Sequence, residues 1–149
     1  MSDMIIQLLT ALLGSLGFAL LFQLRKGLLV AASVGGLINW GVYLLVANFV
    51  DGEFIPCFVA AAAAVIYCEI SARVLKAPVT LFLVPSVVPS VPGGALFYTM
   101  SNVVRKDWSA AKEFGLKTAE FALGIAAGIC LAVVVFSIVN SILHRQKKQ

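Results

Sequence analysis

The fold depends most on one stretch, residues 83–94, which reads Leu83-Val84-Pro85-Ser86-Val87-Val88-Pro89-Ser90-Val91-Pro92-Gly93-Gly94. It lies inside an apolar run from Val79 to Val104, which is long enough to cross a membrane. Each proline lacks an N–H and clashes with the carbonyl group four residues before it. Because unsatisfied backbone groups are costly in hydrocarbon, a broken helix persists there only where protein or a wet cavity surrounds it. The stretch therefore predicts a membrane helix that is discontinuous at a Pro/Gly-rich break.

The composition is that of a membrane protein. Of the 149 residues, 61% are hydrophobic and only 12% are charged, and the mean hydropathy is +1.02. Soluble domains are about 45–50% apolar and about 25% charged. We therefore expect an all-α integral membrane protein with one transmembrane domain over residues 1–149 and no soluble catalytic domain. The net charge of +4 comes from basic residues between and after the apolar runs, which orient membrane proteins, so no nucleic-acid binding is expected.

The apolar runs predict about five membrane segments, at residues 4–24, 27–49, 55–75, 79–104 and 118–143. Residues 105–117 are expected to be a mixed-charge linker; a short interfacial helix is the alternative, which Gly115 disfavours. The first run has no positively charged segment before it, so it predicts a retained span and not a signal peptide. Small side chains recur every four residues in the first and last segments and favour close helix packing; they are Ala11, Ser15 and Ala19, and Gly124, Gly128 and Ala132.

The loop charges suggest an orientation. Basic residues at 25–26, at 73–76 and in the tail at 144–149 predict a cytoplasmic side, while the acidic loop at 51–53 predicts the external side. If residues 79–104 cross the membrane, the basic linker lies on the external side and breaks this rule. If they return to the side from which they came, the linker is cytoplasmic and the basic tail is external, so the tail breaks it. Five segments with a cytoplasmic tail are favoured, and both topologies stay open.

Three polar side chains stand out within the spans. Glu69 and Arg73 are four residues apart on one helical face, which predicts either an interfacial ion pair or a proton or cation site. Asn39 should lie near mid-membrane, where a polar group needs a partner. That partner is either a neighbouring helix or a solute.

The metal-ligating residue types are few. Cys57, Cys68 and Cys130 lie in or beside apolar runs without a CxxC spacing, which is typical of small hydrophobic residues in packed helices. The one histidine, His144, lies in the basic tail. No metal site and no cofactor are predicted.

The break itself has the features of a solute site. Pro92 fits the first turn of a second half-helix, where Gly93 and Gly94 leave their N–H groups unshielded. In discontinuous transporter helices such N-termini point at anionic substrate groups. Polar side chains that fit the same cavity are Ser86, Ser90, Tyr98, Thr99 and Asn102. A proline-kinked helix without a ligand role is the alternative.

The order Glu69, Arg73, Pro78, Val84-Pro85, Pro89, Val91-Pro92-Gly93 and Tyr98 resembles the threonine/serine exporter family of bacteria. More closely, it resembles the short subunit that carries only the second membrane half of that family, over nearly the whole chain. The resemblance implies a multi-pass protein of the bacterial inner membrane. It also implies a partner, which is a longer membrane subunit of the family, further copies of this chain, or both.

The resemblance further implies a subunit of a secondary exporter, with threonine or serine as the favoured substrate and alternating access around the broken helix. The resemblance implies site roles for Glu69, Pro85, Pro89, Pro92, Gly93 and Tyr98. With Ser90 and Gly94 added from the break itself, the expected substrate-binding residues are Pro85, Pro89, Ser90, Pro92, Gly93, Gly94 and Tyr98, and the expected charged or coupling site is Glu69 with Arg73. Two alternatives stay open: a subunit for dicarboxylate (succinate) export, and a non-transporting scaffold that stabilises a partner. An enzyme is not expected, since no paired aspartates and no catalytic serine setting occur.

Overall fold

Helices form all of the regular structure in this computed structural model, which describes residues 2–146, with side chains over residues 4–140. They are α1 (Ser2–Leu21), α2 (Lys26–Ala47), α3 (Phe54–Leu75), α4 (Thr80–Val87), the 3₁₀ helix η1 (Val88–Ser90), α5 (Gly93–Val104) and α6 (Trp108–Gln146). Helices α1, α2, α3 and α6 are long and apolar enough to cross a membrane, and α4–η1 with α5 forms a fifth candidate that is bent by 53°. The predicted all-α membrane fold is confirmed.

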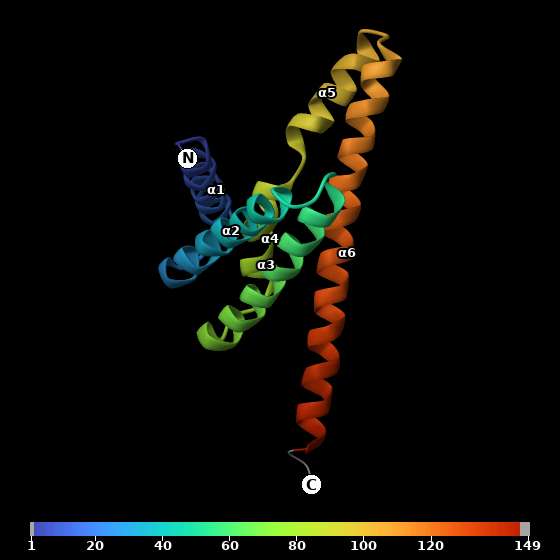
Figure 1. Cartoon of the computed structure of the whole chain (residues 1–149). Coiled ribbons are helices and arrows are strands. Elements are labelled where there is room, and N and C mark those ends of the chain that lie inside the picture. The colour runs from blue at the N-terminus through green and yellow to red at the C-terminus, as the bar shows by residue number, and fades with distance from the viewer. Residues whose placement is uncertain (1, 147–149) are drawn as a thin grey trace.

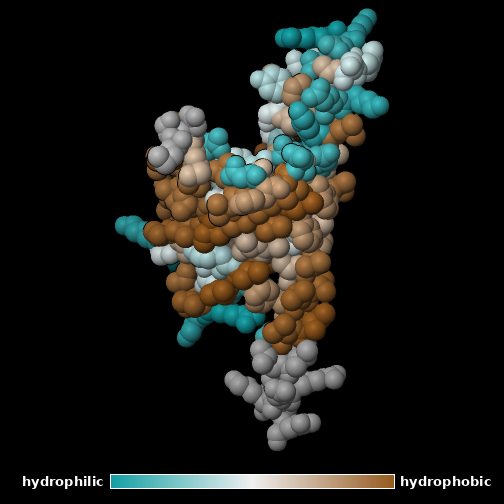
Figure 2. Space-filling view, viewed as in Figure 1, coloured by the Kyte–Doolittle hydropathy of each residue, from teal (hydrophilic) through white to brown (hydrophobic). Residues whose placement is uncertain are grey.

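The helices form a packed group with one long hairpin beside it (Figure 1). Helix α2 packs against α1, α3 and α4, while α3 packs along α6. Helix α5 packs against the first part of α6, has no buried residue, and forms with it a hairpin that projects beyond the other helices. Figure 2 shows a broad hydrophobic band across the packed helices, whereas hydrophilic residues gather at the outer end of the hairpin.

The core is built mainly from small side chains. Ala19, Ala32, Cys68 and Ala72 surround one large buried residue, Phe82, where α1 to α4 meet. The predicted small-residue face of α1 is buried at all three of its positions. Small residues let helix backbones approach closely in a membrane, where no hydrophobic effect drives helices together.

The small-residue face of α6 packs against α3. A Cβ added at Gly124 would lie 2.6 Å from the Phe54 carbonyl oxygen, and one at Gly128 would overlap the Phe58 carbonyl oxygen. Ala132, one turn later, is also buried. The predicted contact face of the last segment is confirmed.

The predicted linker at residues 105–117 was wrong for most of its length, because α6 already begins at Trp108. Asp107 Oδ1 accepts a hydrogen bond from the Ala110 N–H (3.2 Å), and such a side-chain cap favours a helix start. Glu113 and Lys117 form an ion pair one turn apart (3.1 Å). Gly115 does not break the helix; a Cβ there would lie 3.6 Å from Thr99 on α5.

Opposite charges lie at opposite ends of α2. At its start, Arg25 and Lys76 line one cavity, so the loops that follow α1 and α3 lie together. Beyond its end, the Glu53 N–H donates to Glu120 Oε2 (3.2 Å), and the Tyr43 hydroxyl donates to Glu53 Oε2 (2.6 Å). One edge of the helix group is therefore basic and the other acidic. The basic tail at 144–149 lies outside the described side chains.

Candidate functional site

The break between α4 and α5 is a short irregular connection. Pro85 lies inside α4, so the carbonyl group of Leu81 has no amide partner four residues later. After η1, Val91 is extended (φ −66°, ψ 124°), and its N–H donates to the Val88 carbonyl (3.1 Å). Pro92 then precedes α5. The backbone leaves its helical path over two residues, Val91 and Pro92.

Asn39 of α2 holds the break from the side. Its side chain is fully buried, and Nδ2 donates to the Ser86 carbonyl oxygen (3.0 Å) and to Ser90 Oγ (2.7 Å). The Ser86 hydroxyl donates back to the Phe82 carbonyl oxygen of its own helix (2.7 Å). The partner that Asn39 was expected to need is thus the broken segment itself.

Three buried side-chain atoms lack a hydrogen-bond partner within residues 4–140, and all three lie on α1 or α2: Ser15 Oγ, Asn39 Oδ1 and Trp40 Nε1. Ser15 packs against Gly36, where an added Cβ would overlap its Oγ. An unsatisfied buried polar group costs about 1–3 kcal/mol, and more in hydrocarbon. Because Gly36, Asn39 and Trp40 lie on one face of α2 and Ser15 packs against Gly36, the three atoms lie at the contact of α1 with α2.

A cavity of about 190 Å³ lies nearby, and of these three residues Trp40 lines it. It lies between α1 and α2, next to η1, and is lined by Gln7, Thr10, Ala11, Trp40 and Pro89. We call it the α1–α2 cavity. Of the predicted binding residues, Pro89 lines it, and Ser90 lies buried beside it through its bond to Asn39.

Other predicted residues lie elsewhere. Gly93 and Gly94 are exposed, and nothing lies within 4 Å of a Cβ built on either. The Gly93 N–H already donates to the Val91 carbonyl (2.8 Å), whereas the Gly94 N–H falls in the first helical turn, which has no intrahelical acceptor. Tyr98 is 53% exposed, and its ring lies 5.3 Å from that of Phe114 in the α5–α6 hairpin.

The predicted charged pair lies on α3. Glu69 Oε2 and Arg73 Nη2 are 3.8 Å apart, with side chains 20% and 51% exposed. The Arg73 guanidinium also lies 5.5 Å from the ring centroid of Phe136 on α6. The pair therefore faces α6, while the preceding residue, Cys68, faces the break through its thiol, 3.6 Å from Ser86 Oγ.

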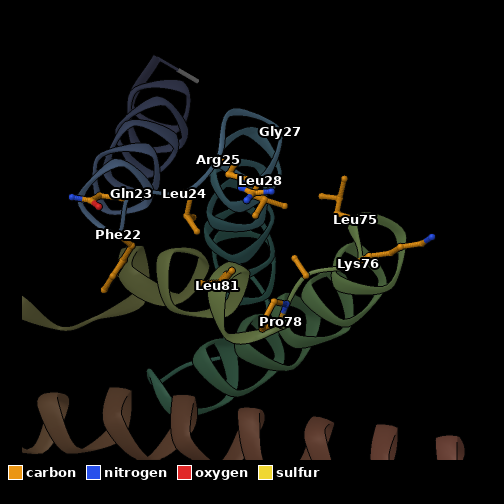
Figure 3. Close-up of a pocket in the computed structure, with 11 residues that line it drawn as sticks. Phe22, Gln23, Leu24, Arg25, Gly27, Leu28, Leu75, Lys76, Pro78 and Leu81 are labelled. Atoms are coloured by element: carbon orange, nitrogen blue, oxygen red, sulfur yellow. The ribbon is translucent and has the colours of Figure 1, made fainter.

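A second, larger cavity of about 550 Å³ lies at the basic edge (Figure 3). It is an open cavity lined by the α1–α2 and α3–α4 loops and the helix ends beside them, and we call it the basic cavity. Arg25 and Lys76 bring positive charge to it from different loops, and no acidic side chain among residues 4–140 lines it. Gln23 and Lys76 turn these loops in the left-handed conformation, with φ of 55° and 50°.

Within the described part of the chain, no three His, Cys, Asp or Glu residues come together as a metal site requires. Cys57 and Cys68 are buried in helix contacts, and Cys130 is exposed on α6. The described cavities therefore offer neutral polar groups or cationic groups as their binding chemistry.

The sequence analysis did not identify Gln7, Thr10, Ser15 or Trp40 as candidate polar contacts. Single polar residues on an apolar helix carry no signal of which neighbour they face. The one available signal was their period, since Gln7, Thr10 and Ala11 fall on one face of a helix.

Comparison with known proteins identifies the family. No curated protein and no solved structure matches the chain. The family model described as Threonine/Serine exporter, ThrE, matches residues 7–135, which include all of α2 to α5 and most of α1 and α6. The chain therefore belongs to the threonine/serine exporter family.

Proposed function

We propose that the chain is a subunit of a secondary exporter that moves threonine and serine out of the bacterial cell across the inner membrane. Membership of the exporter family and the apolar helices support a multi-pass membrane transporter for small solutes. The substrate, the alternating-access mechanism and the partner subunit are parts of the proposal.

The observation that carries the proposal is the polar, irregular backbone inside an apolar protein. Helices α4 and α5 meet at 53°, and Asn39 is bonded to both the backbone and a side chain of the break. Irregular backbone at membrane depth is tolerated where it is buried in protein or lines a cavity. In secondary transporters such broken helices bind the substrate.

In the proposed mechanism, the carboxylate of the amino acid meets the free amide of Gly94 at the start of α5. Carbonyl groups released by Pro85 and Pro89 accept its ammonium group. Ser90 and Tyr98 join the site only after a movement, because Ser90 is buried against Asn39 and Tyr98 packs on Phe114. Movement of α5 together with α6 about Val91 and Pro92 is the proposed switch between the two access states, and α6 then slides along α3, since it packs on both α5 and α3.

The basic cavity is the proposed inward-facing mouth. Its two cations attract carboxylates, and a cleft lined by one sign of charge raises the local concentration of oppositely charged solutes. Glu69 is the proposed carrier of a coupling proton, with Arg73 as its charge partner.

The test is efflux of labelled threonine from cells that produce the chain together with the longer family subunit. Gly93→Leu is expected to lower efflux several-fold at equal abundance of the chain, because the side chain covers the start of α5. The matched control is Gly14→Leu, since both glycines are exposed and have open space around them.

Efflux by Gly93→Leu at the wild-type rate would contradict the proposed site. A scaffold role predicts a different result: the variant then lowers the amount of the partner subunit in the membrane, while efflux per partner molecule stays unchanged.

A further inference from the structure

The basic cavity lies at the level where lipid headgroups meet a membrane protein. The candidate membrane spans of α1, α2 and α3 end or begin beside it, at Leu21, Lys26 and Leu75. Its walls are therefore placed where the hydrocarbon of a bilayer gives way to the charged surface. At this level an open cavity of about 550 Å³ is accessible to lipid headgroups as well as to solutes.

Two cations line the cavity without a carboxylate partner among residues 4–140. The ion pairs within those residues lie elsewhere, on α3 and on α6, so neither Arg25 nor Lys76 is neutralised by one of their carboxylates. The Arg25 guanidinium can bind two oxygens of a phosphate with parallel N–H groups. The Lys76 side chain extends away from Arg25 at the rim (Figure 3), and its flexible stem lets the ammonium group turn toward a headgroup.

Apolar side chains continue from the basic cavity along α4. A neighbouring cavity of about 210 Å³ shares Phe22 and Leu81 with it and is lined further by Thr80, Val84 and Pro85. We call it the α4 cavity. None of these five residues is ionisable, and Phe22 and Val84 are 51% and 48% exposed. The α4 cavity therefore offers an accessible apolar surface directly beside the two cations.

The two cavities together fit an amphipathic anion. The basic cavity suits a negatively charged group, and the α4 cavity suits a hydrocarbon chain. Free phosphate and small zwitterionic solutes have no such chain, and a zwitterionic lipid has no net negative charge. An anionic phospholipid has both parts. Basic pockets between membrane helices on the cytoplasmic side bind headgroups of this kind, and the basic residues of this edge predict the cytoplasmic side.

We propose that the basic cavity and the α4 cavity form a binding site for one anionic phospholipid. Its phosphate lies at Arg25 and Lys76, and an acyl chain packs against Phe22, Leu81 and Val84. This inference goes beyond the proposed function and does not depend on the transported solute. A phosphodiester carries one negative charge against two cations, so the cavity keeps a net positive charge and can still attract carboxylates.

The first test is a lipid titration of the purified full chain in mild detergent, measured by native mass spectrometry and by Tm. Phosphatidylglycerol is compared with phosphatidylcholine of the same acyl chains and with inorganic phosphate. Phosphatidylglycerol is expected to bind at least about ten-fold more tightly than phosphatidylcholine and to raise Tm. Inorganic phosphate at the same concentration is expected not to displace it. Equal affinity for the two lipids, or displacement by phosphate, would overturn the inference.

The second test removes the cations. Arg25→Gln and Lys76→Gln should each weaken phosphatidylglycerol binding about five-fold, and the double variant about thirty-fold, which is the usual contribution of cations at a membrane surface. The matched control is Lys26→Gln, because Lys26 is exposed at the same edge but does not line the cavity. It removes the same charge and should change the affinity little. An equal loss in the control would show only general attraction to the basic edge, which contradicts a site.

The third test concerns the acyl chain. Affinity should rise with chain length in the wild-type protein, by about four-fold for each CH₂ group that gains apolar contact. This rise should be smaller in Val84→Gln, which places an amide in the α4 cavity. Val74→Gln is the control, since Val74 is 73% exposed on α3 and lines neither cavity. A chain-length dependence that Val84→Gln leaves unaltered would contradict the inference.

Amide exchange locates the bound lipid on the fold. Phosphatidylglycerol should slow exchange over residues 22–25 and 76–81, and slowing confined to other residues would place the lipid elsewhere and overturn the inference. None of these measurements involves efflux, so the two proposals fail separately. If the lipid tests fail while the chain exports threonine, only the lipid site is wrong. If the chain binds the lipid as expected but exports neither threonine nor serine, only the exporter proposal is wrong.

Discussion

Adding one methyl group at Gly124 should weaken the packing of α3 against α6. The new Cβ would lie 2.6 Å from the Phe54 carbonyl oxygen and 2.9 Å from Cys57 Cβ. Ordinary contact begins near 3.4 Å, so the two helices must separate locally by about 0.8 Å (3.4 minus 2.6). A gap of about 0.5–1 Å loses about a quarter to a half of the dispersion energy of the contacting atoms. Since overpacking typically costs about 1–3 kcal/mol, we expect Gly124→Ala to lower the free energy of unfolding by about that amount.

Gly17→Ala is the matched control, because it makes the same chemical change in a helix where nothing lies within 4 Å of the new Cβ. Alanine is a better helix former than glycine by about 0.5–1 kcal/mol, so this variant should gain stability. The measurement is thermal unfolding of the purified chain in mild detergent, followed by circular dichroism. The two variants should shift Tm in opposite directions. An unchanged or raised Tm for Gly124→Ala would refute the close approach of α3 and α6.

Three further changes test the break and the basic edge. Asn39→Leu removes two hydrogen bonds to the break while nearly keeping the side-chain shape. It should lower the free energy of unfolding by about 1–2 kcal/mol and accelerate amide exchange over residues 86–91. Unchanged exchange over these residues would mean that the two bonds do not stabilise the break. Pro92→Ala allows α5 to extend toward η1 and should reduce threonine efflux several-fold at equal abundance, so wild-type efflux would argue against a functional break. The double variant Arg25→Gln/Lys76→Gln should raise the efflux KM for carboxylate-bearing solutes and weaken the dependence of this KM on salt. The control Lys112→Gln on the hairpin should change neither quantity. An equal effect of the control and the double variant would contradict a role of the basic cavity.

Local patterns in the chain were enough to predict the helices and the membrane class. Hydropathy and proline positions depend on a residue and its near neighbours, so the four spans and the interruption near Pro92 could be derived without tertiary information. The small-residue faces of the first and last spans were also predictable, because a four-residue period places side chains on one side of a helix. The start of α6 was not predicted, because the charged composition of residues 105–117 was interpreted as a linker. Asp107 in fact caps a helix there.

The candidate site depends on how the helices are rotated and shifted against one another, which no local pattern records. Asn39 is 51 residues away from Ser90 in the chain, and their hydrogen bond forms only because α2 packs against the break at the position of Asn39. The same packing turns Trp40 toward the α1–α2 cavity and leaves Gly94 exposed at the start of α5. The sequence of residues 83–94 was therefore sufficient to predict that the helix breaks within an apolar run. Which polar groups meet at that break was decided by tertiary packing, because hydrogen bonds and cavities depend on contacts between segments distant in the chain.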